Sequence, residues 1–188
     1  MSTKRIKGSA KVTVTIPVDE SNPYDAPDSI DIPMDGSQLN EKDFEQIDTE
    51  PEDLDKKTVL LIEDNREIRF FITYLLKPEF NVIQARDGQE GIHAAFKHIP
   101  DLIISDVMMP KTDGYELCTI LKKDERTCHI PVILLTASDN AEGSLKGYQT
   151  GADDYITKPF TNEHLKLKVR NIISAHEAAR NKKPESPS

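Results

Sequence analysis

The sequence predicts an α/β fold, in which a parallel β-sheet carries helices on both of its faces. Two observations support this prediction. From residue 58 onward, short apolar runs alternate five times with segments whose apolar residues follow the period of a helix. The apolar runs are nearly continuous, as in "TVLLIED" at residues 58–64, which is typical of strands buried on both faces of a sheet.

Five strands are expected in this part of the chain, each followed by a helix. The first helix starts near Asn65 and places Ile68, Phe71 and Leu75 on one face. The last helix starts near Thr161, a residue type that commonly caps a helix N-terminus. The strands are expected at residues 58–64, 80–85, 101–105, 130–137 and 153–157, and the helices at residues 65–76, 87–99, 113–124, 141–150 and from 161 onward.

The chain divides by composition into four segments. Residues 1–18 contain "KVTVTIPV", whose strict alternation of apolar and polar residues predicts an isolated strand. Residues 19–57 combine acidic residues, prolines and scattered apolar residues, which predicts a flexible acidic linker. Residues 58–176 form the predicted α/β domain, and residues 177–188 are expected to be a disordered tail.

The net charge of −9 is concentrated in the expected linker. Residues 19–55 hold fourteen acidic residues and one Lys, whereas residues 56–188 hold nineteen acidic and nineteen basic residues. A domain without a basic stripe has no electrostatic footprint for nucleic acid, so we expect no such partner. No apolar run reaches the roughly 18 residues of a membrane span, and no secretory segment follows Met1. The two cysteines lack disulfide or metal spacing, and we expect a cytoplasmic protein without membrane contact.

Polar side chains stand at the predicted carboxyl ends of four strands. Glu63 and Asp64 follow the first strand, Asp106 the third, Thr136 ends the fourth, and Lys158 follows the fifth. In an open parallel sheet these ends lie along one rim, where ligands bind. Clustered carboxylates repel one another unless a cation neutralises them, and a site built from oxygen ligands favours Mg²⁺. The sequence therefore predicts a Mg²⁺ site with an ammonium group beside it.

Asp106 is the central carboxylate of this rim. A carboxylate can attack phosphorus and form an acyl phosphate when cations neutralise the phosphoryl oxygens. The hydroxyl of Thr136 can then donate a hydrogen bond to a phosphoryl oxygen. Each residue alone would have an ordinary interpretation as a helix cap, a turn residue or a solvated charge. Their joint placement at the strand ends predicts that Asp106, Thr136 and Lys158 carry phosphoryl chemistry.

Residues 58–176 resemble the receiver domain of two-component response regulators. The resemblance rests on "LLIEDN", "DLIISDVMMPKTDG", "VILLTA" and "GADDYITKPF", and it covers 119 of the 188 residues. It implies a flavodoxin-like (βα)5 three-layer sandwich with a parallel sheet of strand order 2-1-3-4-5. It also implies a phosphoacceptor in His-Asp signal transduction, whose partner is a sensor histidine kinase or its dimerisation or phosphotransfer domain.

The resemblance also implies a role for each residue of the rim. The implied roles are phosphorylation for Asp106, Mg²⁺ coordination for Glu63, Asp64, Asp106 and the main-chain carbonyl of Met108, phosphoryl binding for Lys158, and conformational switching for Thr136 and Tyr155. The peptide bond to Pro159 is expected to be cis. Glu63 stands where Asp is commoner, so its longer side chain is expected to reach the metal through water. An apolar Met108 cannot orient an attacking water, which predicts no unusually fast loss of the phosphoryl group.

The context of the domain has two interpretations. "GSAKVTVTIPV" is similar to the closing strand of the ATP-binding domain of a sensor histidine kinase, which would make the chain part of a hybrid histidine kinase. Alternatively, the chain is a stand-alone single-domain regulator. In both cases the domain itself is a phosphoacceptor and not a conventional enzyme. It is expected to contact a downstream protein or a second copy through residues 141–150, 153–157 and the last helix.

Two other classes with related chemistry or fold fit the sequence less well. A phosphatase of the haloacid dehalogenase type also forms an aspartyl phosphate, but it expects a second acid two residues after the nucleophile, where Met108 stands. A flavodoxin that binds flavin mononucleotide needs a phosphate loop rich in Ser, Thr and Gly after the first strand. "EDNRE" occupies that position in this chain.

Overall fold

The structure is a computed structural model with two compact units, residues 1–46 and 47–188. It describes residues 53–137 and 150–181 in full and, in the first unit, the backbone of β1 (Lys11–Thr15) and β2 (Ser29–Pro33). The two strands of the first unit pair antiparallel, with Lys11 opposite Pro33. Residues 1–18 therefore do not hold an isolated strand, and a strand lies inside the expected linker of residues 19–57. The sequence pattern does not reveal β2 because "SIDIP" has only two alternating apolar residues among acidic neighbours.

The second unit contains a sheet of five parallel strands. Its strands are β3 (Thr58–Ile62), β4 (Asn81–Ala85), β5 (Leu102–Asp106), β6 (Val132–Thr136) and β7 (Asp154–Thr157). Their spatial order is β4-β3-β5-β6-β7, and every neighbouring pair is parallel. Counted within this unit, that is the order 2-1-3-4-5 of the flavodoxin-like fold, so the prediction is confirmed.

Four helices of this unit lie within the described residues. They are α1 (Arg66–Leu76), α2 (Gly88–His98), α3 (Gly114–Lys123) and α5 (Asn162–Asn181). An Asn or Asp side chain caps each of the first three by accepting hydrogen bonds from main-chain N–H groups of the first turn, and these residues are Asn65, Asp87 and Asp113. The helix expected at residues 141–150 lies outside the described residues, except that Thr150 is helical.

Both ends of the α/β unit differ from the expected boundaries of residues 58 and 176. Before β3, the main-chain carbonyl of Asp53 accepts a hydrogen bond of 2.6 Å from the Asn81 amide, so this part of the expected linker contacts the sheet. At the other end, α5 continues to Asn181, and the expected disordered tail therefore begins with helical residues. The last buried residue of α5 is Ile173, so apolar periodicity could not locate the end of this helix.

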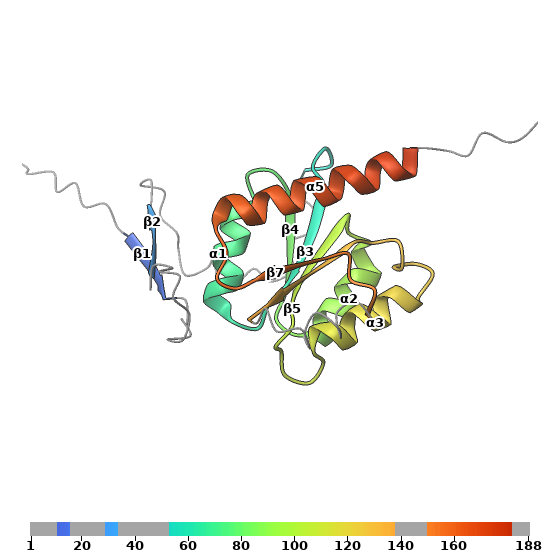
Figure 1. Cartoon of the computed structure of the whole chain (residues 1–188), viewed down its shortest axis with the longest axis horizontal. Coiled ribbons are helices and arrows are strands. Elements are labelled where there is room, and N and C mark those ends of the chain that lie inside the picture. The colour runs from blue at the N-terminus through green and yellow to red at the C-terminus, as the bar shows by residue number, and fades with distance from the viewer. Residues whose placement is uncertain (1–10, 16–28, 34–52, 138–149, 182–188) are drawn as a thin grey trace, which may run out of the picture. The chain divides into compact units, whose positions relative to one another are not determined.

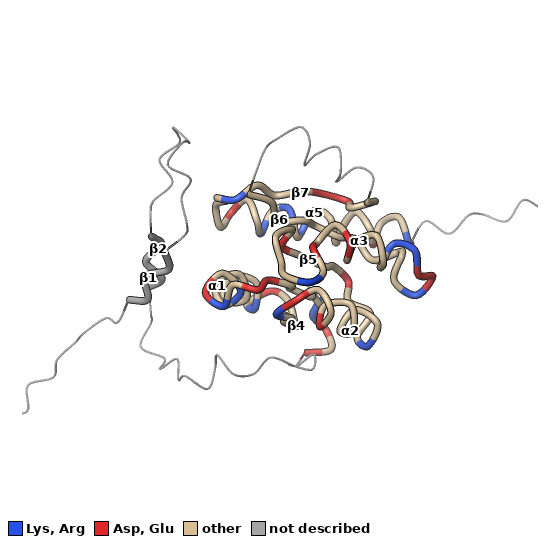
Figure 2. The backbone as a smooth tube through the Cα atoms, turned by 90° about the horizontal axis from the view of Figure 1, so that it is seen from below, with Lys and Arg blue, Asp and Glu red and all other residues tan. Residues whose placement is uncertain are grey.

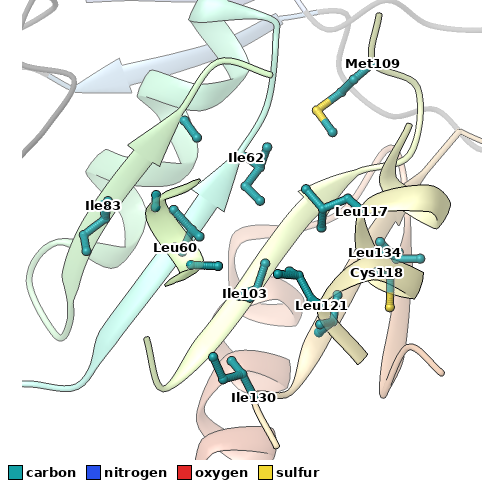
Figure 3. Packing of buried hydrophobic residues seen from close by; sticks show 14 of the residues in the cluster. Leu60, Ile62, Ile83, Ile103, Met109, Leu117, Cys118, Leu121, Ile130 and Leu134 are labelled. Atoms are coloured by element: carbon teal, nitrogen blue, oxygen red, sulfur yellow. The ribbon is translucent and has the colours of Figure 1, made fainter. Parts of the chain in front are cut away.

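The helices form a layer on each side of the sheet. Helices α1 and α5 lie on one side, and α2 and α3 lie on the other (Figure 1). Alternate residues of the strands serve the two layers. On the side of α2 and α3, Leu117 and Leu121 of α3 pack against Ile103 and Leu134 of the sheet (Figure 3). Burial on both sides explains why the strand sequences are almost continuously apolar.

The described helices and loops of this unit carry charges of both signs, spread along the chain (Figure 2). Within residues 53–137 and 150–181, no helix combines the length and the apolar character needed to span a membrane. The parallel arrangement brings the carboxyl ends of β3, β5, β6 and β7 to one edge of the sheet. The side chains at that edge form the candidate site.

Candidate functional site at the carboxyl edge of the sheet

Three carboxylates meet where β3 and β5 end. Glu63 and Asp64 follow the last residue of β3, and Asp106 is the last residue of β5. Carboxylate oxygens of all three residues lie within 4.8 Å of one another. The side chain of Asp64 is exposed, whereas Glu63 and Asp106 are buried, with 1% and 6% of their surfaces accessible. Among the described residues this is the group of acidic side chains arranged to hold a metal ion.

Lys158 connects two of these carboxylates. Its Nζ lies 2.9 Å from Oε2 of Glu63 and 3.1 Å from Oδ1 of Asp106, and 18% of its side chain is exposed. The main chain holds the lysine in place, because its N–H donates to the carbonyl of Thr136 at 2.7 Å. The following peptide bond, to Pro159, is cis, as expected. One ammonium group thus contacts both buried carboxylates.

Burial and mutual repulsion shape the ionisation of this group. Burial raises the pKa of Glu63, and the nearby charge of Asp106 adds to that rise, while Lys158 opposes it. Burial likewise raises the pKa of Asp106, with Lys158 opposing and Asp64 contributing to the rise. For Lys158, burial acts to lower the pKa, but Glu63 and Asp106 together outweigh it and raise the pKa. With all three carboxylates ionised, the site carries more negative charge than its one lysine neutralises, which is the electrostatic condition for binding a cation.

The loop after Asp106 is held tightly behind the carboxylate. The Gly114 N–H donates to the carbonyl of Val107 at 3.0 Å. A Cβ on Gly114 would lie 2.9 Å from the Cα of Val107 and would also overlap the carbonyl oxygen of Asp106, so only glycine fits here. In the same loop Met108 is exposed over 73% of its surface, whereas Met109 is buried in the core. The loop thus presents Met108 to solvent beside the carboxylates.

Thr136 and Tyr155 lie on neighbouring strands at the same edge. Thr136 pairs with Thr157, and Tyr155 pairs with Leu134, so Thr136 and Tyr155 are diagonal neighbours on one face of the sheet. Thr136 is half-buried at the end of β6. The ring of Tyr155 packs against the core that lies beneath α2 and α3, and its hydroxyl oxygen is shielded from solvent. Thr136 and Tyr155, the residues predicted to switch, are therefore adjacent in the fold.

Sequence reasoning missed one buried residue at this site. Arg69 of α1 is 6% exposed, and its Nη1 donates to the main-chain carbonyls of Glu63 and Asp64 at 2.6 and 3.3 Å. In the sequence, Arg69 stands between the apolar residues Ile68 and Phe70, where an arginine would ordinarily face solvent. The available signal for this contact in the sequence was the position of Arg69, five residues after Asp64.

Comparison with known families identifies the α/β unit. Residues 59–170 match the family model of the response regulator receiver domain, which is more than half of the chain. The matched range includes the described site residues from Glu63 to Lys158.

Two curated relatives are histidine kinases. Over 135 residues the chain is 42% identical to "Histidine kinase P4" of Formosa agariphila, which is 72% of this chain and 10% of the relative. Over 141 residues it is 39% identical to "Hybrid signal transduction histidine kinase D" of Dictyostelium discoideum, covering 75% of this chain and 9% of the relative. The chain thus spans about a tenth of the length of these relatives.

Solved structures give the same assignment. The receiver domain of a signal transduction histidine kinase from Syntrophus aciditrophicus matches with a TM-score of 0.61 and 34% identity, over 70% of this chain and 97% of that one. The receiver domain of a sensor histidine kinase from Pseudomonas aeruginosa, with magnesium coordinated in its active-site cleft, matches with a TM-score of 0.60 and 28% identity, over 63% and 98% of the two chains. The chain therefore belongs to the response regulator receiver domain family and functions in two-component signal transduction.

Proposed function

We propose that Asp106 is the residue that accepts the phosphoryl group. The observation that carries this proposal is the placement of Lys158, whose Nζ lies 3.1 Å from Asp106 and 2.9 Å from Glu63. The ammonium group pairs with the carboxylate of Asp106 and can pair with a phosphoryl oxygen once the phosphoryl group arrives. Asp106 is distinguished from Glu63 by its place at the end of β5, the central strand, which lies between β3 and β6.

The proposed step is an in-line displacement at phosphorus. A carboxylate oxygen of Asp106 forms a bond to phosphorus while the P–N bond of a phosphohistidine breaks, and the imidazole nitrogen keeps the electron pair of that bond. The product is an acyl phosphate on Asp106 and a histidine on the kinase, which leaves as a neutral imidazole because its other ring nitrogen carries a proton. Thr136, at the end of the neighbouring strand, would donate its hydroxyl hydrogen to a phosphoryl oxygen. Lys158 would pair with another of these oxygens.

The residues present fit a divalent cation that prefers oxygen ligands. Glu63, Asp64 and Asp106 bring carboxylate oxygens within 4.8 Å of one another, and no nitrogen or sulfur ligand belongs to the group. We assign Mg²⁺ coordination to Asp64, Asp106 and the main-chain carbonyl of Met108, with Glu63 contributing through water. When bound, the ion would neutralise phosphoryl oxygens and orient the group for attack.

We further propose that the partner is a histidine kinase and that the chain is the receiver part of a hybrid kinase. The alignments with the two kinase relatives extend over 135 and 141 residues, longer than the 112 residues matched by the receiver family model. The alignment with the transcriptional regulator RpaA of Synechocystis, at 40% identity, extends over 116 residues. The coding sequence upstream of codon 1 tests this context. A continuous reading frame into an ATP-binding domain is expected, and an in-frame stop codon would contradict it.

Phosphorylation of Asp106 is expected to change the surface formed by β7 and α5 through Thr136 and Tyr155. Movement of the Thr136 hydroxyl toward a phosphoryl oxygen would open space behind it on the face that Tyr155 shares. A downstream protein or a second copy of the chain would read this change. The third part of the expected surface, residues 141–150, lies almost entirely outside the described residues.

Labelling with acetyl phosphate tests the assignment of Asp106. In the presence of Mg²⁺, the chain should take up one phosphoryl group, identified by mass spectrometry as a mass increase and mapped to Asp106 after reduction of the acyl phosphate. Asp106→Asn should abolish the label. Asp101→Asn is the matched control, because Asp101 bonds Lys57 at the opposite edge of the sheet, and it should label normally. Label that persists in Asp106→Asn would refute the assignment.

A further inference from the structure

Arg69 is the one cation among the buried residues of the described part of the chain. The buried charged residues there are Glu63, Arg69 and Asp106, and the other two are anions of the site. Burying a guanidinium removes it from water, which is unfavourable before its partners are counted. An apolar side chain at this position of α1 would pack on the sheet without that cost. The buried arginine therefore calls for an explanation beyond packing.

The guanidinium holds the chain segment that carries two of the carboxylates. Nη1 of Arg69 donates to the carbonyl of Glu63 at 2.6 Å and to that of Asp64 at 3.3 Å. The ladder of β3 ends at Ile62, and the N–H of Glu63 donates to the carbonyl of Ala85 at 3.1 Å. The main chain at Glu63 is thus held through its N–H by β4 and through its carbonyl by α1. Its carboxylate can then face Lys158 and Asp106.

The geometry of a helix explains how the side chain reaches this segment. Side chains on an α-helix lean toward its N-terminus, so a residue in the second turn covers the chain that enters the helix. Asn65 fixes the start of α1, since its Oδ1 accepts from the N–H groups of Glu67 and Ile68 at 2.9 and 3.1 Å. Arg69 then lies one turn further, and its main-chain N–H donates to the Asn65 carbonyl at 2.9 Å.

The charge of Arg69 acts in the same direction as its hydrogen bonds. A guanidinium keeps its proton throughout the physiological range, so the buried group is a permanent cation. It attracts the carboxylate of Glu63, which lies on the strand end that it binds. A cation beneath the segment reduces the mutual repulsion of the carboxylates that must converge on one ion.

We propose that Arg69 is a positioning residue of the divalent-cation site, which holds the Glu63 and Asp64 main chain so that their carboxylates converge with Asp106. This inference rests on the proposed function, because the site is the one assigned there to Mg²⁺. Arg69 touches neither the ion nor the phosphoryl group. Its effect should therefore be on the affinity for Mg²⁺ and not on the phosphoryl step once Mg²⁺ is saturating.

Calorimetric titration of Mg²⁺ into the full chain tests the proposal. Arg69→Met keeps an unbranched, shorter side chain and removes the guanidinium with its charge and donors, and the dissociation constant for Mg²⁺ should rise by roughly 10-fold or more, as for other partners of metal ligands. Arg69→Lys keeps the charge and one donor group, so it should lie between wild type and Arg69→Met. Labelling of Arg69→Met by acetyl phosphate should return to the wild-type rate at saturating Mg²⁺.

Arg170→Met is the matched control, because Arg170 of α5 pairs with Glu79 away from the site and should leave Mg²⁺ affinity within twofold of wild type. A folded Arg69→Met with wild-type affinity would overturn the proposal. If Arg69→Met does not fold, Arg69→Lys decides, since an affinity weakened threefold or more supports the role and wild-type affinity overturns it. A wild-type chain that binds no Mg²⁺ would refute the proposed function itself, and the role of Arg69 with it.

Discussion

Replacing Lys158 by Met would leave two buried carboxylates without their cation. Glu63 and Asp106 are 1% and 6% exposed, and both contact the Lys158 Nζ. Met has a similar length and no charge, so the substitution removes the charge and leaves the volume nearly unchanged. The change therefore isolates the electrostatic contribution of Lys158.

The distances give the size of the expected effect. A pair of opposite charges about 3 Å apart attracts by about 5 kcal/mol at an effective dielectric constant of about 20, and Lys158 makes two such contacts, at 2.9 and 3.1 Å. Much of this attraction offsets the cost of burying the ammonium group. Removing one partner of a buried pair destabilises proteins by about 3 to 5 kcal/mol. Because 18% of Lys158 is exposed, we expect about 3 kcal/mol at pH 7.5 without Mg²⁺.

The loss of stability should depend on pH in a defined direction. Lys158 opposes the raised pKa of both carboxyl groups, so without it each pKa rises further above its unfolded value. A carboxyl group whose pKa is higher in the folded state than in the unfolded state favours folding when the pH lies below the pKa of the unfolded state. This contribution to stability is lost as the pH rises through the pKa of the folded state. The deficit of the variant should therefore shrink as the pH falls from 7.5 to 5.5.

Urea unfolding of wild type and Lys158→Met at both pH values measures these differences. Saturating Mg²⁺ should stabilise the variant more than wild type, because the ion supplies the missing positive charge. Lys168→Met is the control, since Lys168 contacts a single half-exposed carboxylate, that of Asp154, and should cost about 1 kcal/mol or less. A deficit below about 1 kcal/mol for Lys158→Met, or one that is equal at both pH values, would refute the electrostatic account.

Three further predictions concern the same edge of the sheet. Gly114→Ala should destabilise the unit by about 1 to 3 kcal/mol in urea unfolding and should slow the labelling of Asp106, because the Cβ of the alanine would meet the main chain of Asp106 and Val107. Wild-type stability of this variant would contradict the tight contact. Mg²⁺ affinity should fall as the pH drops from 7.5 to 5.5. The reason is that Glu63 and Asp106 have raised pKa values and bind the ion in their deprotonated form. Calorimetry at both pH values checks this. The purified acyl phosphate should not decay within seconds, because Met108, exposed two residues after Asp106, is apolar and cannot orient water. The decay of label after removal of acetyl phosphate measures this.

Sequence periodicity predicted the five strands of the α/β unit to within two residues at every boundary. The strands are buried on both faces, so their apolar runs are local signals that need no knowledge of their neighbours. Helix starts were equally local, as Asn65 shows, because a cap bonds residues two and three positions ahead. The strand order came from the family resemblance, since periodicity does not encode which strands pair.

Sequence periodicity did not locate elements that have few apolar residues. Strand β2 has only two alternating isoleucines, at positions 30 and 32, next to acidic residues and a proline. The end of α5 passes beyond Ile173 through Ala175, Ala178 and Ala179, which are exposed and therefore show no periodic pattern, although alanine favours the helix. The end of α5 thus stays helical without a buried stripe.

The amino-acid sequence by itself determined the class of fold, the elements of the sheet and the residue types at the carboxyl ends of its strands. Only the tertiary structure decided that Lys158 bridges Glu63 and Asp106, and that Arg69 is buried against the main chain of the acidic segment. Lys158 and Glu63 are 95 positions apart, and their contact depends on the order of the strands and the path of the loops between them. Local patterns reflect interactions within a turn or a strand, whereas the balance of charge in the site arises from groups that only the assembled sheet brings together.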